Sequence, residues 1–429
     1  MKSKLFIIMT LVVAFGLLAA QCGVAPTTQP AATEAPATEA PATEAAPTQA
    51  PATEAAPTEA PAPAQAVTIS IWHGYIETEE QVFSQVVSDF QAANPNIKID
   101  VLAVPFTELQ NKFQTEVAAG GGPTLVTGPQ DRMAGYAQAD LLATMPDSAP
   151  FLNDLVPAAV EGGKVNGKLV GVPINNKVVA MFYNKSMVDS APADFDALLS
   201  LAADHGMALT ADWFHNYMWA PAFGAKFFDE NYKVVIDSPE GAKAYSYFKQ
   251  VCESKGVTCD ANDGDMDTLF RQSEVAFRFQ GPWASGDFIK DVGAENVVVT
   301  AIPPIPGADY PRPWNQSEMI SMNVGATPEE VDAALQFIGY LTSADVQKMF
   351  LEKANWIPAN ANVDTSSNPV VGGFLAQVPH SDPFPVAAEL GATWDPMQNA
   401  ITKILEGVST PQEALTEAAQ IINEANQKP

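Results

Sequence analysis

The feature that most constrains the fold is a strict alternation of strand and helix patterns after residue 66. The first strand, VTISIW, alternates in polarity and is rich in β-branched residues, and the segment after it places apolar side chains at helical spacing. The alternating segments are residues 67–72, 79–93, 97–104, 106–119 and 125–127, with a third helix after the last. This order predicts an open α/β sheet flanked by helices.

The ends of these strands carry the first candidate site residues. Trp72 and His73 end the first strand, and Asp131 and Arg132 follow the third. Ligands of open α/β sheets bind beyond the carboxyl ends of the strands, so all four side chains fall on one rim. Asp131 and Arg132 are either a solvated ion pair, which contributes little, or a pair that faces a cleft and holds a ligand, which we favour. For Trp72 and His73, packing and ligand contact both remain open.

The rest of the chain continues in mixed α/β fashion. Residues 167–185 (GKLVGVPINNKVVAMFYNK) predict two strands joined across Pro173, and residues 211–228 are dense in aromatic side chains. Further strands are expected at residues 274–279, 297–302 and 319–324. Further helices are expected at residues 195–204, 242–255, 329–341, 344–352, 394–406 and 411–424. About 360 residues after the tether are more than one domain usually holds.

The N-terminus predicts export. Lys2 and Lys4 precede an uncharged apolar run that is too short for a typical membrane span and ends in small residues, so residues 1–21 are expected to be an export signal. Cys22 follows at the place where a bacterial lipoprotein carries its lipid, although Ala19 and Gln21 depart from the usual lipobox. We favour a lipid anchor over an ordinary secretory cut, which would leave an odd cysteine in an exported chain.

The segment after Cys22 predicts a tether. Residues 22–66 are dominated by repeats of Ala, Pro, Thr and Glu, with almost no apolar bulk to bury. Such a composition remains extended and semi-rigid. The whole chain has a formal net charge of −28, which argues against nucleic acid and anionic lipid as partners. Contact with the membrane is therefore expected only through the lipid anchor.

The two remaining cysteines lie close together in VCESKGVTCD. In an oxidising compartment Cys252 and Cys259 are expected to form a disulfide that closes a small loop. The alternative is two free thiols.

The order of motifs resembles the extracellular solute-binding proteins of ABC importers, within the sugar-binding group that includes the maltose-binding proteins. The resemblance covers the chain from about residue 67 to its end. It is carried by GGGPTLVTGPQDRMAGYAQADLLATM (120–145), MFYNKSMV (181–188), VAFRFQGPWASGDF (275–288) and PEEVDAALQFIGYLTSADVQKMFLEKANWIPAN (328–360).

The resemblance implies an α/β, two-lobed periplasmic-binding-protein fold. Each lobe would be an open sheet flanked by helices, with several hinge crossings and a ligand cleft between the lobes. Lobe one would comprise residues 67–174 and 314–360, and lobe two residues 175–313 and 361–429. The expected function is to trap an oligosaccharide, with maltose or maltodextrin as the first guess, and to deliver it to permease subunits as a monomer without a cofactor.

The resemblance also implies which residues hold the sugar. Asp131 and Arg132 would bind hydroxyl groups, and Trp283 and Trp394 would stack on sugar rings rather than pack in a core. Phe214 and Asn216 lie where the family has a contact loop, although that loop aligns poorly. Lys177 stands where maltose-binding members have a carboxylate, and Gly128 stands where they have a tryptophan. These two departures leave the identity of the sugar open.

Other functions were weighed against this one. We find no nucleophile motif, phosphate loop or metal-ligand cluster, so we do not expect an enzyme. Residues 260–267 (DANDGDMD) resemble the start of a calcium loop, but Arg271 occupies the twelfth position, where that loop needs a glutamate, so we expect an acidic turn and no metal. A sensor without a transport role, and a non-sugar solute such as a polyamine, remain alternatives.

Overall fold

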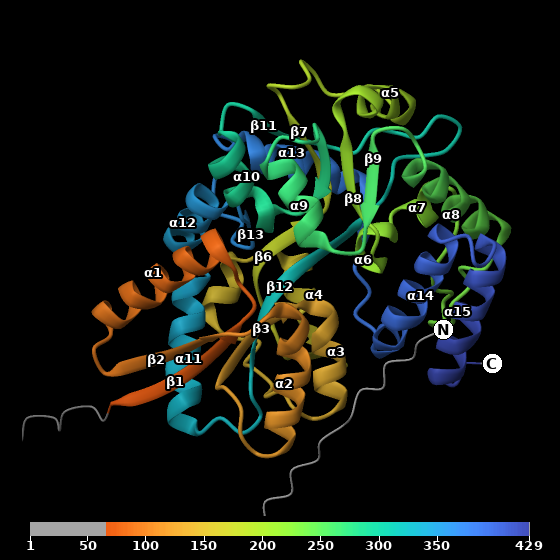
Figure 1. Cartoon of the computed structure of the whole chain (residues 1–429). Coiled ribbons are helices and arrows are strands. Elements are labelled where there is room, and N and C mark those ends of the chain that lie inside the picture. The colour runs from red at the N-terminus through yellow and green to blue at the C-terminus, as the bar shows by residue number, and fades with distance from the viewer. Residues whose placement is uncertain (1–65, 429) are drawn as a thin grey trace, which may run out of the picture. The chain divides into compact units, whose positions relative to one another are not determined.

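The computed structural model describes residues 66–428 (Figure 1). The expected export signal (1–21), Cys22 and the tether up to residue 65 lie outside the described residues. Within residues 66–428, the structure contains no helix whose length and apolar character would let it cross a membrane.

The first sheet, sheet one, has seven strands, three of which come from the N-terminal third of the chain. β1 runs parallel to β2 and β3, whereas β12 runs antiparallel to both β3 and β6. The strands in sheet order are β13 (Ile357–Pro358), β6 (Val172–Val178), β12 (Trp314–Met322), β3 (Leu125–Pro129), β1 (Val67–His73) and β2 (Ile97–Ala103), with β14 (Asp382–Pro383) paired to β12.

The second sheet, sheet two, has five strands. β8, β9 and β10 are parallel, and β7 runs antiparallel between β10 and β11. In sheet order the strands are β11 (Val297–Thr300), β7 (Ala180–Asn184), β10 (Phe277–Gln280), β8 (Met207–Thr210) and β9 (Val257–Asp260). A separate small hairpin pairs β4 (Lys164–Val165) with β5 (Lys168–Leu169).

Helices cover both faces of each sheet. Those on sheet one are α1 (Glu77–Ala93), α11 (Pro328–Leu341) and α12 (Ala344–Ala354) on one face, and α2 (Phe106–Ala118) and α3 (Gln130–Gln138) on the other (Figure 1). Those that pack on sheet two include α5 (Phe195–His205), α8 (Pro239–Cys252), α14 (Trp394–Leu405), α15 (Pro411–Ala425), α9 (Asp263–Arg271), α10 (Ser285–Val292) and α13 (Pro369–Gln377).

Short helices complete the chain. They are α4 (Pro157–Gly162), α6 (Trp213–Asn216), α7 (Trp219–Ala222), and the 3-10 helices η1 (Pro150–Asp154), η2 (Pro282–Ala284), η3 (Val378–His380) and η4 (Ala388–Thr393). Local signals account for several helix starts. Thr327 with Glu330, and Thr410 with Glu413, form capping boxes in front of α11 and α15.

The chain first passes from sheet one to sheet two between β6 and β7, which are separated by one residue, Val179. The prediction of a break at Pro173 is wrong, because Pro173 lies inside β6. The missing N–H of this proline falls at a register shift opposite Glu318 and Met319, so the strand continues past it. β6 remains paired with β12 as far as Val178, four residues beyond the expected end of lobe one at Ile174.

The structure also contains elements that the sequence patterns missed. β8, β9, α9, α10 and α13 had no predicted counterpart, and β12 begins at Trp314 rather than at Met319. The first half of β12 reads WNQSE, which lacks an alternating apolar pattern and is recruited to the sheet by pairing with β6. The acidic segment at residues 260–267 does not form an isolated turn, because Asn262 caps α9 and Asp263 starts it.

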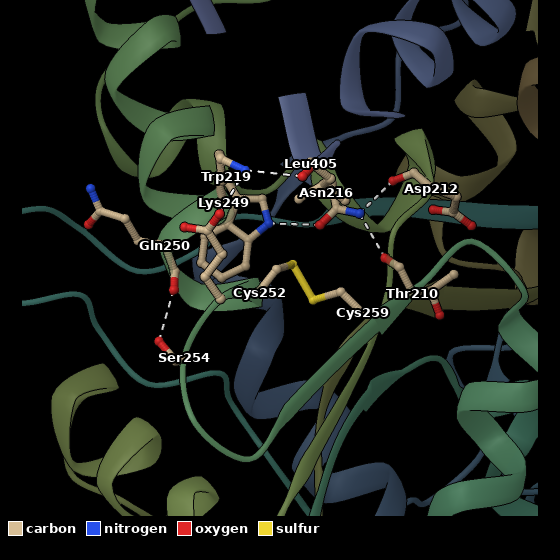
Figure 2. Close-up of a disulfide and its surroundings, with 11 residues drawn as sticks. Thr210, Asp212, Asn216, Trp219, Lys249, Gln250, Cys252, Ser254, Cys259 and Leu405 are labelled. Carbon is tan, nitrogen blue, oxygen red and sulfur yellow. Dashed lines mark hydrogen bonds and ion pairs between the residues drawn. A yellow bond between two sulfur atoms is a disulfide. The ribbon is translucent and has the colours of Figure 1, made fainter. Parts of the chain in front are cut away.

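A disulfide links Cys252, at the end of α8, to Cys259 in β9 (Figure 2). Beside it, Lys249 Nζ donates a hydrogen bond to the carbonyl oxygen of Leu405 at 3.0 Å. The bridge therefore fixes the connection between α8 and the edge strand of sheet two.

We expect the loss of this disulfide to lower stability moderately. The two cysteines are seven residues apart, and closing so short a loop restricts the unfolded chain by about 2 kcal/mol. The double variant Cys252→Ser/Cys259→Ser should therefore unfold at a lower urea concentration than the parent under oxidising conditions. A reductant should lower the parent's midpoint and leave the variant's unchanged. Equal midpoints under oxidising conditions would contradict the prediction.

Candidate ligand-binding site

Three loops of sheet one open on the same edge. Because β1, β2 and β3 are parallel, their last residues (His73, Ala103 and Pro129) lie at one rim, and α1, α2 and α3 begin just beyond it. A backbone hydrogen bond of 2.9 Å from Val104 to His73 ties two of these loops together. The rim is the edge at which open α/β sheets bind ligands.

Asp131 and Arg132 lie in the first turn of α3, and they do not form a solvated ion pair. Arg132 is 9% exposed, and neither side chain forms a salt bridge within residues 66–428. The Arg132 guanidinium lies 3.9 Å from the centre of the Phe106 ring, and Nη2 donates to the Phe106 carbonyl oxygen at 3.3 Å. Its buried Nη1 has no hydrogen-bond partner in the described part of the chain.

Asp131 is half-buried beside it. Burial raises the pKa of the Asp131 carboxyl to about 6, against the opposing effect of Arg132 and of backbone hydrogen bonds. Asp131 and Arg132 thus offer an acceptor and an unpaired donor on adjacent residues, which is the combination that a pair of neighbouring hydroxyl groups needs.

The strands next to the crossing carry a buried ion pair. Lys177 Nζ lies 2.6 Å from Glu318 Oε2, and the two side chains are 12% and 5% exposed. Burial lowers the pKa of Lys177, but the nearby carboxylates of Glu318 and Glu79 raise it by more, so the pKa lies above its usual value. Lys177 Nζ also lies 5.6 Å from the centre of the Trp283 ring. Lys177 therefore connects sheet one to the aromatic side chains of sheet two.

A second buried carboxyl lies next to this pair. Glu79, on α1, accepts a hydrogen bond of 2.5 Å from Trp356 Nε1. Burial raises the pKa of Glu79 to about 7, although Lys177 and the Trp356 hydrogen bond lower it.

Several polar atoms near these groups are buried without a partner among the described residues. They are Tyr75 Oη, Thr127 Oγ1, Gln316 Oε1 and both amide atoms of Asn175. Asn175 pairs across the sheet with Glu318, and Gln316 with Lys177, so two of these residues share the end of sheet one with the ion pair. Buried polar groups in folded proteins are almost always hydrogen-bonded. These atoms are therefore candidates for bonds to water or to a ligand.

The aromatic side of the site comes from sheet two. Trp283 follows β10 in η2 and lies directly over Gly281, where an added Cβ would be 2.0 Å from a carbon of the indole ring. Only glycine permits this close approach. Phe214, in α6, has its ring centre 6.1 Å from that of Trp283. Both side chains are half-buried, so each retains accessible surface.

Trp394 begins α14, and its ring centre lies 6.3 Å from that of Trp314, which is 6.2 Å from Phe214. The predicted aromatic residues Phe214, Trp283 and Trp394 therefore belong to one aromatic cluster built around a buried Trp314.

A charged network supports this cluster. His215 Nδ1 contacts Asp212 at 2.9 Å, and Nε2 lies 3.2 Å from the side-chain oxygen of Gln280. Burial lowers the pKa of His215, but Asp212 outweighs this effect and the pKa rises to about 9, so the ring carries a charge at neutral pH. The Gln280 oxygen also accepts the backbone N–H of Gly281. The network therefore fixes the turn that carries Trp283.

Three of the predicted residues make packing contacts in this structure. Trp72 lies in the core between sheet one and α2, and His73 is fully buried and stacked on Tyr75. Burial lowers the pKa of His73 to about 4. Asn216 is occupied internally, because its amide nitrogen donates to the carbonyl oxygens of Thr210 and Asp212 and its oxygen accepts from Trp219 Nε1 (Figure 2).

The sequence patterns missed Phe106, Asn175, Gln316 and Glu318. Phe106 had a usable signal, because it follows the second strand as Asp131 follows the third. The other three lie inside strands, and their role depends on a cross-strand register that the sequence does not reveal. Among residues 66–428, no cluster of three or more metal-ligating side chains is present.

Comparisons with known proteins identify the family of the chain. The profile for bacterial extracellular solute-binding proteins matches residues 85–371, which is more than half of the chain. The chain belongs to this family. The family consists of solute-binding proteins rather than enzymes, and of proteins that act outside the cell membrane.

Curated relatives include sugar-binding members. A maltotriose-binding protein of Pyrococcus abyssi is 28% identical over 358 residues, which are 79% of this chain and 77% of the relative. A maltooligosaccharide ABC transporter solute-binding lipoprotein of Streptococcus pneumoniae is 26% identical over 344 residues, 73% of this chain and 79% of the relative.

Solved structures show the same two-lobed α/β fold. The maltotriose-binding protein of Thermus thermophilus, solved with maltotriose, has a TM-score of 0.76 and 25% identity, and the match covers 83% of this chain and all of that one. A maltose/maltodextrin-binding domain from Bdellovibrio bacteriovorus has a TM-score of 0.77 at 23% identity, with 84% of this chain covered.

The raised pKa of Glu79 predicts a pH-dependent stability. The folded state holds its proton up to about pH 7, whereas the unfolded chain releases it near 4.5. The contribution of Glu79 to stability is therefore complete below 4.5 and is lost as the pH rises through about 7. Glu79→Gln keeps a neutral acceptor for Trp356. In urea unfolding, the difference in stability between Glu79→Gln and the parent should therefore favour the variant more at pH 8 than at pH 5.

The neighbouring Glu80→Gln, a change in a less buried glutamate of the same helix, serves as the control and should show no such trend. A stability difference between Glu79→Gln and the parent that stays constant from pH 5 to pH 8 would show that Glu79 is ionised throughout.

Proposed function

We propose that this protein is the substrate-binding component of a carbohydrate ABC importer. It traps an oligosaccharide, of which maltodextrins are the first candidates, between two lobes and presents it to permease subunits. The observation that carries the proposal is the meeting of two complementary surfaces at Lys177. Half-buried aromatic side chains on sheet two meet buried, unpaired hydrogen-bonding groups on sheet one.

These two surfaces match the chemistry of a sugar. A pyranose ring has apolar C–H faces, which stack on Trp283 and Phe214, and hydroxyl groups around its edge, which bond to Asp131, Arg132 and the Lys177–Glu318 pair. Trp394 extends the aromatic side. The names of the relatives support the same class of ligand, since they bind maltotriose and maltooligosaccharides.

We also propose how the protein is held and how it moves. Lobe one comprises residues 67–178 and 314–358 together with β14, and lobe two the rest of residues 180–300 and 369–428, with the sheets as the rigid bodies. Residues 1–21 direct export, Cys22 carries a lipid, and the tether keeps the monomeric lobes away from the membrane. One of the relatives is named a lipoprotein, which supports the anchor.

Ligand titration tests the ligand class. Purified parent protein should bind maltotriose in calorimetry and show a dose-dependent rise in unfolding temperature, because the sugar binds only the folded state. Trp283→Ala should weaken binding by about 10- to 100-fold, since it removes a central aromatic contact. Asp131→Asn should weaken it by about tenfold through the loss of charge-assisted hydrogen bonds.

Val408→Ala, a change in an exposed side chain between α14 and α15, is the control and should bind as the parent does. Binding of spermidine that falls with salt, with no response to any sugar, would replace the proposed ligand by a charged solute.

A contact between α1 and α10 makes the closing motion testable by mutation. Thr78 Oγ1 donates to Asp287 at 2.9 Å, and Arg271 on α9 lies 3.3 Å from Glu77. The approach depends on Gly286, where an added Cβ would lie 2.7 Å from the Thr78 side chain. We propose that this contact belongs to the ligand-bound form.

Gly286→Ala should therefore weaken sugar binding by about fivefold or more, because overpacking this contact costs about 1–3 kcal/mol. The loss of affinity should occur even though alanine has a higher helix propensity than glycine and so stabilises α10 itself. Gly372→Ala, in α13, is the matched control, since an added Cβ meets no atom within 4 Å there. Equal affinities of the two variants in calorimetry would show that this contact has no part in the bound form.

A further inference from the structure

Phe106 presents an exposed aromatic ring next to the candidate site. Its side chain is 50% exposed, and among the described aromatic residues only Tyr232, at 42%, is comparably exposed. A single exposed apolar side chain is ordinary on a protein surface, so a role for Phe106 depends on its contacts.

Phe106 lies on the rim of sheet one. It is the first residue of α2, and it follows β2 as Asp131 follows β3. The ring lies against the backbone of Gly74, where an added Cβ would be 3.3 Å from Cδ2 of the ring. The loops after β1 and β2 therefore meet at this ring.

Arg132 holds the ring from the third loop. Its guanidinium covers the ring at 3.9 Å while Nη2 bonds to the Phe106 carbonyl oxygen at 3.3 Å. Two contacts to one residue fix both partners, and a ring held in this way loses little further freedom when a ligand binds. The unpaired Nη1 of Arg132 places a hydrogen-bond donor next to an accessible aromatic surface.

We propose that Phe106 is a stacking surface for a sugar ring on lobe one, in addition to the Trp283 surface of lobe two. The inference rests on the proposed function and adds a requirement to it. A ligand must have at least two rings to use both surfaces, so the protein selects oligosaccharides by length. Gly128, at the end of β3, has no side chain that could serve as a stacking surface there, so Phe106 supplies the aromatic surface of this lobe.

The requirement for at least two sugar rings can be tested by calorimetry. Glucose, maltose and maltotriose are titrated into the parent, Phe106→Leu and Phe106→Trp. Leucine keeps apolar bulk but lacks a flat ring, so Phe106→Leu should weaken maltotriose binding by about tenfold. The loss should be smaller for the shortest sugar that the parent binds. Phe106→Trp should retain the parent's affinity for maltotriose. Tyr232→Leu, which removes the other exposed ring, is the matched control and should change nothing.

Each outcome separates this inference from the function on which it rests. If the parent binds no sugar, the proposed function fails and the inference falls with it. If the parent binds maltotriose and Phe106→Leu binds it equally well, only the inference fails. An equal loss for sugars of every length would show that Phe106 merely positions Arg132. The unfolding temperatures without ligand show whether each variant is folded.

Discussion

The candidate site depends on the antiparallel pairing of β12 with β3 on one side and β6 on the other. Through this register Glu318 lies opposite both Pro129 and Asn175. The pairing therefore brings the loop of Asp131 and Arg132, the strand of Lys177 and a buried carboxylate to one place, although they are far apart in the sequence. It also holds the strand that leads into sheet two at Val179. A change in this register would displace every polar group of lobe one at once.

The Lys177–Glu318 pair gives this arrangement its electrostatic character. A buried ion pair adds little net stability, because removing two charges from water offsets most of their attraction. The loss of one partner is costly, however, since it leaves a charge without compensation. Glu79, held with a pKa of about 7, lies close enough to affect the same lysine. The site thus keeps two cations, Lys177 and the buried Arg132, among several carboxyl groups, next to atoms that have no partner in the described chain.

The two lobes contribute different chemistry, and the fold explains why. In sheet one the strands end in loops that start helices, so polar side chains such as Asp131 stand at helix starts near backbone N–H groups. In sheet two the turn after β10 is held by Gln280, and the space above Gly281 admits the Trp283 ring. A sugar bound between them would meet hydrogen-bonding groups on one side and aromatic rings on the other. Phe106 is the exception, an aromatic ring on the polar side.

The sequence by itself determined the α/β class, most of the helices and strands, and the position of Asp131 and Arg132 on the rim of sheet one, because these depend on local periodicity and on the positions of strand ends. It also led to Cys252 and Cys259, which are close in the chain. Only the tertiary structure decided that β6 continues through Pro173, that His73 and Asn216 are internal, and that Asn175, Gln316 and Glu318 meet at one end of sheet one. Those outcomes depend on which strands pair and in what register, and on which surfaces pack. Such contacts join residues distant in the sequence, so no local pattern encodes them.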